Sequence, residues 1–377
     1  MNTIYKKFKN INFNDKIEKK NNVKDSELLN VYNIIKQSNF FSGKLQGQLK
    51  SFIENKKFYC YEIYIKDKDV QFNIVTSLSI REVKKLYLFL KCLVCFYVKN
   101  NISKKNFIYI VPLDIPKFLP NQKKVLTPEN INSAFSYVNY HQQGGNIYIY
   151  RKQELIKVFV HELLHTFHQD HKLIFNDIYI NEFNSINELN INESLNELCT
   201  IILTIYIKSF LDTGNLNSFI KKVEMLEKKE INHSLKNVKR IMLFNKLDNV
   251  DLFLTKKYKQ NASIFSYIIL RSALMYYMKY EKRNNICNWC INNNNNDNFI
   301  KVFRDLVLTA FKNENWRYSV YKKNIKDNFN RVQIFKMSIF YTFAHLKRRI
   351  KNYLKKYNYY IITMSSLKSI MICYLKV

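Results

Sequence analysis

The chain has 377 residues, of which 47% are hydrophobic, and it carries a formal net charge of +31. This length and apolar content suffice for one large core or two smaller ones, and they exclude a disulfide-stapled mini-protein and a wholly disordered chain. The charge comes from 51 lysines and only 10 arginines, whereas proteins that read phosphates or bases favour arginine, so nucleic-acid binding is an open alternative rather than the favoured role.

The hydrophobic pattern predicts a mixed first half of the chain. Residues 1–26 are polar and are expected to be frayed. Alternating apolar residues then predict a β-hairpin, and Ser79 is placed to cap the helix that follows it. The predicted elements up to residue 112 are a helix at 27–37, strands at 58–65 and 70–77, a helix at 80–99 and a buried strand at 107–112.

An irregular stretch comes next, because all four prolines fall between residues 112 and 128 and the pair Gly144 and Gly145 closes it. A short strand is predicted at 146–150, and it runs into a helix at about 152–169. Beyond Gly145 the chain has a single glycine and no proline. This scarcity favours a mostly helical C-terminal half, with a loop tip at the polar run 292–298.

These elements predict an α+β fold built around a small mixed β-sheet. The expected organisation is a polar N-terminal segment at 1–26, an α+β subdomain at 27–170 and a mainly helical subdomain at 171–377. The α+β subdomain ends in the helix predicted at about 152–169, which is expected to carry the active site. A cleft between the last two parts is the natural place for a functional site.

Residues 161–165 read His-Glu-Leu-Leu-His, within a predicted helix whose apolar residues form a continuous stripe. His161 and His165 are four residues apart, so their rings lie one turn apart on the same face and can bind one Zn²⁺ at about 2.0–2.1 Å. Glu162 lies beside this face, so it can reach a zinc-bound water as a general base without being a ligand itself.

An acidic window surrounds this motif. Residues 161–200 contain one basic residue and seven acids, a net charge of −6 within a strongly basic chain, as expected around a bound cation. Glu193 and Glu197 lie in this window, four residues apart at the start of an apolar helix. One of the two carboxylates can ligate the metal while the other accepts a hydrogen bond from a ligand imidazole.

The His-Glu-x-x-His helix followed by an Asn-Glu-x-x-x-acid helix, at 161–165 and 192–197, resembles the zincin metallopeptidases of the gluzincin, or thermolysin-like, type. The resemblance implies a zincin-like fold with His161, His165 and Glu193 as zinc ligands, Glu162 as the general base and Glu197 as the acid behind a ligand histidine. The stretch from 146 to 197 also resembles uncharacterised zincin-like proteins of large DNA viruses, and the resemblance covers none of residues 1–130 or 215–377.

The identity of the third ligand has a rival interpretation. His171 would complete the three-histidine spacing of the metzincins, but His168 stands where that family has the glycine that turns the chain. Glu193 requires only that a second helix pack beside the first, so it is the favoured third ligand. Glu188, Glu197 and Asp170 are further candidates for this ligand.

A hydrolase also needs a side chain that stabilises the oxyanion formed during the reaction. The residues with suitable chemistry for this role are His168, His171, His233 and Tyr179.

The seven cysteines and an N-terminus without an apolar signal region predict reduced thiols in a cytoplasmic protein, in the host cytoplasm or the virion if the chain is viral. No stretch reaches about 18 apolar residues without a charge, so no membrane span is expected. The pairs Cys92/Cys95 and Cys287/Cys290 each lack the second pair that a structural zinc site needs. The basic, tyrosine-rich stretch 347–360 is expected to be a solvated helical face.

The sequence therefore predicts a zinc-dependent hydrolase, and in particular a metallopeptidase that acts on a peptide or protein substrate. The strand at 146–150 is expected to pair with an extended peptide and to bring the scissile bond over the metal. The alternative is a non-enzymatic, basic protein that binds nucleic acid or belongs to a virion, with a structural or degenerate metal site.

Overall fold

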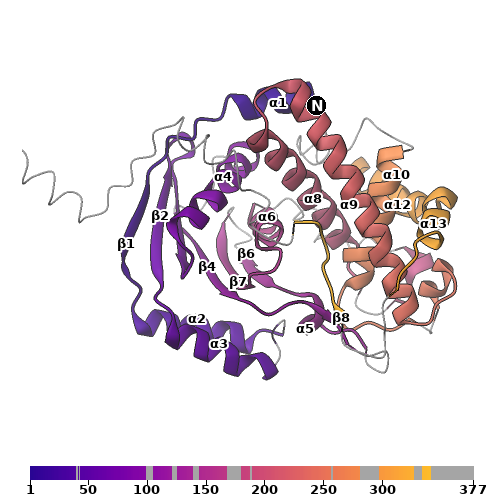
Figure 1. Ribbon diagram of the computed structural model, residues 1–377, viewed down its shortest axis with the longest axis horizontal. Helices are drawn as coiled ribbons and strands as arrows, with labels where there is room; N and C mark the ends of the chain where they lie inside the picture. The colour runs from indigo at the N-terminus through magenta and orange to yellow at the C-terminus, as the bar shows by residue number, and fades with distance from the viewer. Residues whose placement is uncertain are drawn as a thin grey trace, which may run out of the picture.

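The computed structural model is an α+β protein in which one mixed β-sheet curves around helices (Figure 1). It describes residues 1–39, 41, 43–98, 105–120, 125–138, 144–167, 180–186, 189–255, 258–280, 297–326 and 333–340. Within these residues the α+β class and the mixed sheet predicted from the sequence are confirmed.

The main sheet has six strands in the order β1-β2-β3-β4-β7-β6. Strands β3, β4 and β7 are parallel to one another, while β1, β2 and β6 each pair in the antiparallel direction. The bounds are Ile17–Asn22 for β1, Tyr59–Ile65 for β2, Val70–Thr76 for β3, Lys105–Leu113 for β4, Ala134–Val138 for β6 and Gly145–Arg151 for β7. A two-stranded ribbon joins β5 (Phe118–Leu119) to β8 (Gln333–Ile334), far apart in the chain.

Helices cover both faces of this sheet. Inside the curve lie α4 (Ile80–Tyr97) and α6 (Leu155–Thr166), backed by α8 (Ile191–Asp212) (Figure 1). On the other face α2 (Asp25–Gln37) and α3 (Gly43–Asn55) cover a second, smaller core. The remaining helical elements are α1 (Asn2–Lys9), η1 (Lys66–Lys68), α5 (Pro128–Ile131), η2 (Asn181–Phe183), α9 (Leu216–Phe244), η3 (Val250–Leu254), η4 (Phe265–Leu270), α10 (Arg271–Tyr280), α12 (Asp297–Lys312) and α13 (Glu314–Tyr321).

The long elements of the first half agree with the sequence prediction. The hairpin, the strands at 107–112 and 146–150 and the helix starting at residue 80 are confirmed within three residues at the ends that the structure describes. Ser79 accepts a hydrogen bond from the backbone N–H of Glu82, whose side chain in turn accepts from the backbone N–H of Ser79. This capping box fixes the start of α4.

The expectation of a frayed N-terminal segment is wrong. Residues 1–26 contain α1 and the whole of β1, and the side chains of Phe8 and Phe13 are fully buried in the main core. Asp15 forms an ion pair at 2.7 Å with the buried Lys91 of α4. A few well-spaced apolar residues and one buried ion pair thus hold a polar segment in place.

The stretch between residues 112 and 145 is more regular than its prolines suggest. It contains β5, α5 and the edge strand β6, whose partner is β7. Because β7 pairs with β4 on one side and with β6 on the other, it has no free edge. The prediction that strand 146–150 pairs with a peptide is therefore wrong, and β6 is the strand at the border of the sheet.

The only described helix long and apolar enough to cross a membrane is α8. Of its most apolar window, 94% is buried inside the protein, and the helix contacts α6, α9, α10 and η4. This packing is that of a core helix.

Candidate metal centre

Helix α6 presents the two motif histidines to the same side. Its apolar residues Leu155, Phe159 and Leu163 are buried, so the helix is held with the opposite stripe facing α8 and the cavity beside it. The rings of His161 and His165 lie 4.8 Å apart between centroids, and their Nε2 atoms are 3.2 Å apart. The spacing of four residues therefore brings two potential ligand atoms together, as predicted.

Helix α8 brings Glu193 to this pair. Asn190 caps the helix by accepting a hydrogen bond from the backbone N–H of Glu193 at 3.3 Å, so Glu193 lies in the first turn. Its Oε2 atom is 3.5 Å from Nε2 of His161, and its Oε1 atom is 3.6 Å from Nε2 of His165. Among the described residues, His161, His165 and Glu193 are the group of histidine, cysteine and acidic side chains arranged to hold a metal ion.

The spacing of these atoms fits a tetrahedral ion. Bonds of about 2.0–2.1 Å in tetrahedral geometry place neighbouring ligand atoms about 3.3 Å apart. The three observed separations are 3.2, 3.5 and 3.6 Å, the last two to different oxygens of Glu193. These separations are close to those of a tetrahedral site for a small ion.

Glu197 lies one turn further along α8, behind His161. Its Oε1 atom is 3.3 Å from Nδ1 of His161 and also accepts from the ammonium of Lys157. A hydrogen bond from Nδ1–H to this carboxylate places the proton on Nδ1 and leaves the lone pair of Nε2 facing His165. This is the position that the sequence predicts for the acid behind a ligand histidine.

Asn196 is a further member of the site that the sequence analysis missed. Its amide nitrogen lies 2.8 Å from Nε2 of His165 and 3.4 Å from Nε2 of His161. The same amide nitrogen lies 3.5 Å from Nδ1 of His161, so Asn196 contacts both rings. The two Nε2 atoms face each other at 3.2 Å, and a cation between them would bind both nitrogens.

The electrostatic environment shifts the pKa values of two residues at the site. Burial lowers the pKa of His161 well below its ordinary value, and His165, Lys157 and Lys117 lower it further, so the ring stays neutral. Burial raises the pKa of Glu162, although a hydrogen bond with Ser136 opposes this shift. A carboxylate with a raised pKa is a stronger base than an exposed one.

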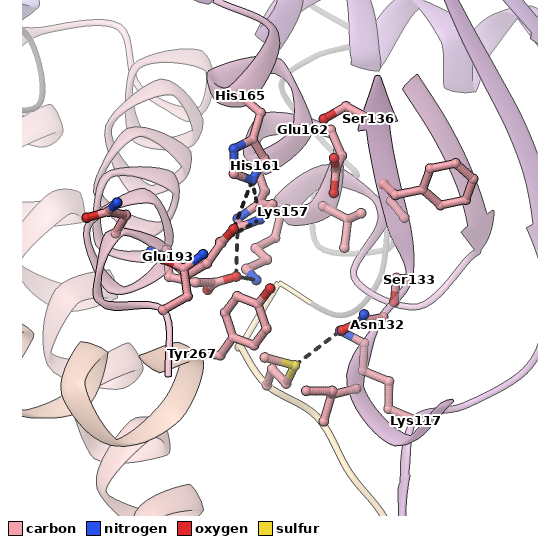
Figure 2. Close-up of a pocket in the computed structure, with 18 of the residues that line it drawn as sticks. Lys117, Asn132, Ser133, Ser136, Lys157, His161, Glu162, His165, Glu193 and Tyr267 are labelled. Atoms are coloured by element: carbon pink, nitrogen blue, oxygen red, sulfur yellow. Dashed lines mark hydrogen bonds and ion pairs between the residues drawn. The ribbon is translucent and has the colours of Figure 1, made fainter. Parts of the chain in front are cut away.

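A cavity of about 280 Å³ opens beside these residues. Figure 2 shows the two imidazoles and Glu193 on one wall, Ser133 and Ser136 on the facing wall, and Tyr267 between Glu193 and the lower end. The facing wall is the edge strand β6 together with residues 131–133 that precede it. The site therefore lies between the helices α6 and α8 and the border strand of the sheet.

Tyr267 reaches the cavity from η4, a π-helical segment. Its ring centroid is 6.2 Å from that of His161. Burial raises the pKa of Tyr267 well above its ordinary value, and the carboxylates of Glu193, Glu197 and Glu162 raise it further. The phenol therefore stays protonated and can donate a hydrogen bond into the cavity.

The side chains that line the cavity carry more acidic than basic groups. Three carboxyl groups and two lysine ammonium groups line it, and none of these side chains is more than 15% exposed. The carboxyl groups are those of Glu162, Glu193 and Glu197, and the ammonium groups are those of Lys117 and Lys157. A cation at this site would offset the excess of acidic groups.

Several other predicted residues do not join this site. His233 lies on α9, where its Nε2 is 2.8 Å from the carbonyl oxygen of Lys336, and it is absent from the cavity lining. Cys92 is a fully buried thiol of α4, as expected for a core residue. The predictions that lie outside the described residues are His168, Asp170, His171, Tyr179, Glu188, Cys287, Cys290 and the basic stretch 347–360. Of the predicted loop tip 292–298, residues 292–296 also lie outside them, and the last two residues are the start of α12 rather than a loop.

Comparison of the chain with protein-family models, curated proteins and solved structures found no match. The chemistry of the site therefore has to be argued from its own residues.

Proposed function

We propose that this protein is a zinc-dependent hydrolase of the zincin type, and in particular a metallopeptidase. His161, His165 and Glu193 would hold the ion, in the gluzincin manner. The observation that carries the proposal is the close grouping of the ligand atoms on the wall of a cavity. The two Nε2 atoms are 3.2 Å apart, and one oxygen of Glu193 lies 3.5 Å from the first while the other lies 3.6 Å from the second. The neighbouring base Glu162 lines the same cavity.

The ligand set favours a catalytic site over a structural one. Structural zinc sites are closed by four protein ligands, whereas catalytic sites have three and an open position, and a set of two histidines and one glutamate is typical of zinc peptidases. The described residues offer three such groups beside a cavity. This supports a hydrolytic role rather than the alternative of a nucleic-acid-binding or virion-associated protein.

Bound zinc would supply an acidified water and would polarise the carbonyl under attack. Glu162 would accept the proton of the attacking water and return it to the leaving amine. Tyr267 would donate a hydrogen bond to the carbonyl oxygen as its negative charge develops. Glu197 would hold the His161 ring through Nδ1 and stabilise its orientation.

The edge strand favours an extended peptide as the substrate. Among the described strands β6 pairs only with β7, and Ala134, Phe135, Ser136 and Val138 line the cavity. A peptide that added to this edge would gain backbone hydrogen bonds and would lie across the cavity from the histidines. This is the role that the sequence analysis assigned to the strand at 146–150.

The test combines metal analysis with a peptide library. The purified protein should contain about one equivalent of zinc, and zinc-loaded protein should cleave peptides of a proteome-derived library, as read by mass spectrometry. A chelator should abolish cleavage, and Glu162→Gln should abolish it without loss of zinc. A protein that binds no zinc but binds DNA with a steep salt dependence would instead favour the nucleic-acid alternative.

A further inference from the structure

Arg271 is a fully buried arginine at the start of α10, behind the metal centre. Its Nη1 atom lies 3.7 Å from Oε2 of Glu197 and 3.7 Å from Oε1 of Glu230. Its Nη2 atom donates a hydrogen bond of 2.9 Å to the carbonyl oxygen of Met337. One guanidinium group thus contacts α8, α9 and the C-terminal segment 333–340.

Glu230 continues this chain of contacts into the same segment. Its Oε2 atom accepts from the hydroxyl of Ser338 at 3.1 Å and from the backbone N–H of Ile339 at 2.9 Å. Glu230 and Ser338 are fully buried, and Met337 lines the cavity. A continuous polar path therefore leads from His161 through Glu197, Arg271 and Glu230 to the C-terminal segment.

The two oxygens of Glu197 have different partners. Oε1 accepts from Lys157 and lies 3.3 Å from Nδ1 of His161, whereas Oε2 is buried and has no hydrogen-bond partner among the described residues, only the ion pair with Arg271. A buried carboxylate is costly to keep ionised unless a cation lies beside it. Arginine suits this position because its planar fork can face two carboxylates and a carbonyl at once.

We propose that Arg271 is a positioning residue of the metal centre. It fixes the orientation of Glu197, and through Glu197 the orientation of His161. Its contact with Glu230 and Met337 makes the C-terminal segment 333–340 part of the same support. This inference rests on the proposed zinc site, and it concerns the affinity of that site for the ion.

The experiment measures the zinc dissociation constant by competition with a chromophoric chelator. Arg271→Met should weaken zinc binding about tenfold, as expected for a residue that supports a ligand from behind. The matched control is Lys91→Met, because Lys91 is also fully buried between two carboxylates, Asp15 and Asp67, at 2.7 Å each. Lys91→Met should lower the melting temperature of the metal-free protein but leave zinc affinity within twofold of wild type.

A double-mutant cycle separates positioning from general damage. In a Glu197→Gln background, Arg271→Met should change zinc affinity by less than twofold, because its partner charge is already gone. If Arg271→Met fails to fold, Arg271→Lys replaces it, since a lysine ammonium cannot contact both carboxylates and the Met337 carbonyl in the same way.

Two results would overturn the inference while leaving the proposed function intact. One is an unchanged zinc affinity in the Arg271 variant. The other is an equal loss of affinity in the presence and absence of the Glu197 carboxylate. A wild-type protein that binds no zinc would instead overturn the proposed function, so the two failures are distinguishable.

Discussion

Nδ1 of His161 and Oε1 of Glu197 lie 3.3 Å apart, across the contact between α6 and α8. This contact fixes the tautomer of the histidine whose Nε2 faces the other candidate ligands. Replacing Glu197 by Ala should therefore weaken zinc binding about 10- to 100-fold, the cost typical of losing such a partner. Isothermal titration of metal-free protein with zinc measures the change, and a loss below threefold would contradict this role for Glu197.

The third ligand can be tested by comparing two alanine variants. Glu193→Ala should reduce zinc content much more than His171→Ala, because Glu193 lies within 3.6 Å of both imidazoles. His161→Ala serves as the positive control and should leave almost no zinc. Metal analysis of the three purified variants gives the order directly, and the reverse order would move the protein to the three-histidine class.

Glu162→Gln should keep about one equivalent of zinc and lose activity about 10²- to 10⁴-fold, the range for loss of a general base. The glutamine keeps the volume of the side chain and can still hydrogen-bond to Ser136. Turnover is measured on a peptide identified from the library. Full activity in this variant would mean that another group takes the proton.

Tyr267→Phe should lower kcat about 10²- to 10³-fold while leaving KM, zinc content and stability nearly unchanged. The reason is that the phenol hydroxyl would act only when charge develops on the carbonyl oxygen. Steady-state kinetics on the same peptide measure both constants. A rise in KM alone would place Tyr267 in substrate binding instead.

Gly145→Ala should destabilise the fold by about 2 kcal/mol or more, because a Cβ at this position would lie 2.1 Å from the carbonyl oxygen of Tyr137, and the backbone φ is +148°. The clash would separate β6 from β7 and so disturb the wall of the cavity. The control is Gly47→Ala in α3, which meets no atom within 4 Å and should stabilise the protein by about 0.5–1 kcal/mol. Urea denaturation of both variants provides the comparison, and equal stabilities would be inconsistent with this account.

The part of the site closest to the motif could be predicted from spacing alone. His161 with His165, and Glu193 with Glu197, are pairs separated by one helical turn, and the packing of α6 on α8 brings them together. Helical periodicity specifies which side chains share a face. It does not specify which other side chains of α8 reach the imidazoles, so Asn196 was missed although it lies on the same helix as Glu193 and Glu197.

Tyr267 and Arg271 could not be found in this way. Tyr267 belongs to a run of apolar residues, and its direction depends on a π-helical turn whose hydrogen-bond pattern has no sequence signature. Arg271 looks like any basic residue of a strongly basic chain, and only its complete burial distinguishes it. Long-range packing, which the sequence does not encode locally, determines both positions.

The N-terminal segment and the edge strand were missed for a related reason. Phe8 and Phe13 are isolated apolar residues among many lysines and asparagines, yet both are fully buried. Strand β6 follows four prolines, and its pairing with β7 depends on a close backbone approach at Gly145. In each case a few residues with specific tertiary contacts outweigh the average composition.

The position of segment 333–340 late in the chain determines when the cavity is completed during synthesis. Strand β8 pairs with β5, and Ser338 bonds to Glu154, 184 positions earlier. The ribosome makes Met337, which lines the cavity, long after the other lining residues His161, Glu162, His165 and Glu193. A nascent chain that already contains those four residues therefore has an incomplete cavity wall. On the ribosome the cavity is therefore finished late, after most of the chain has been made.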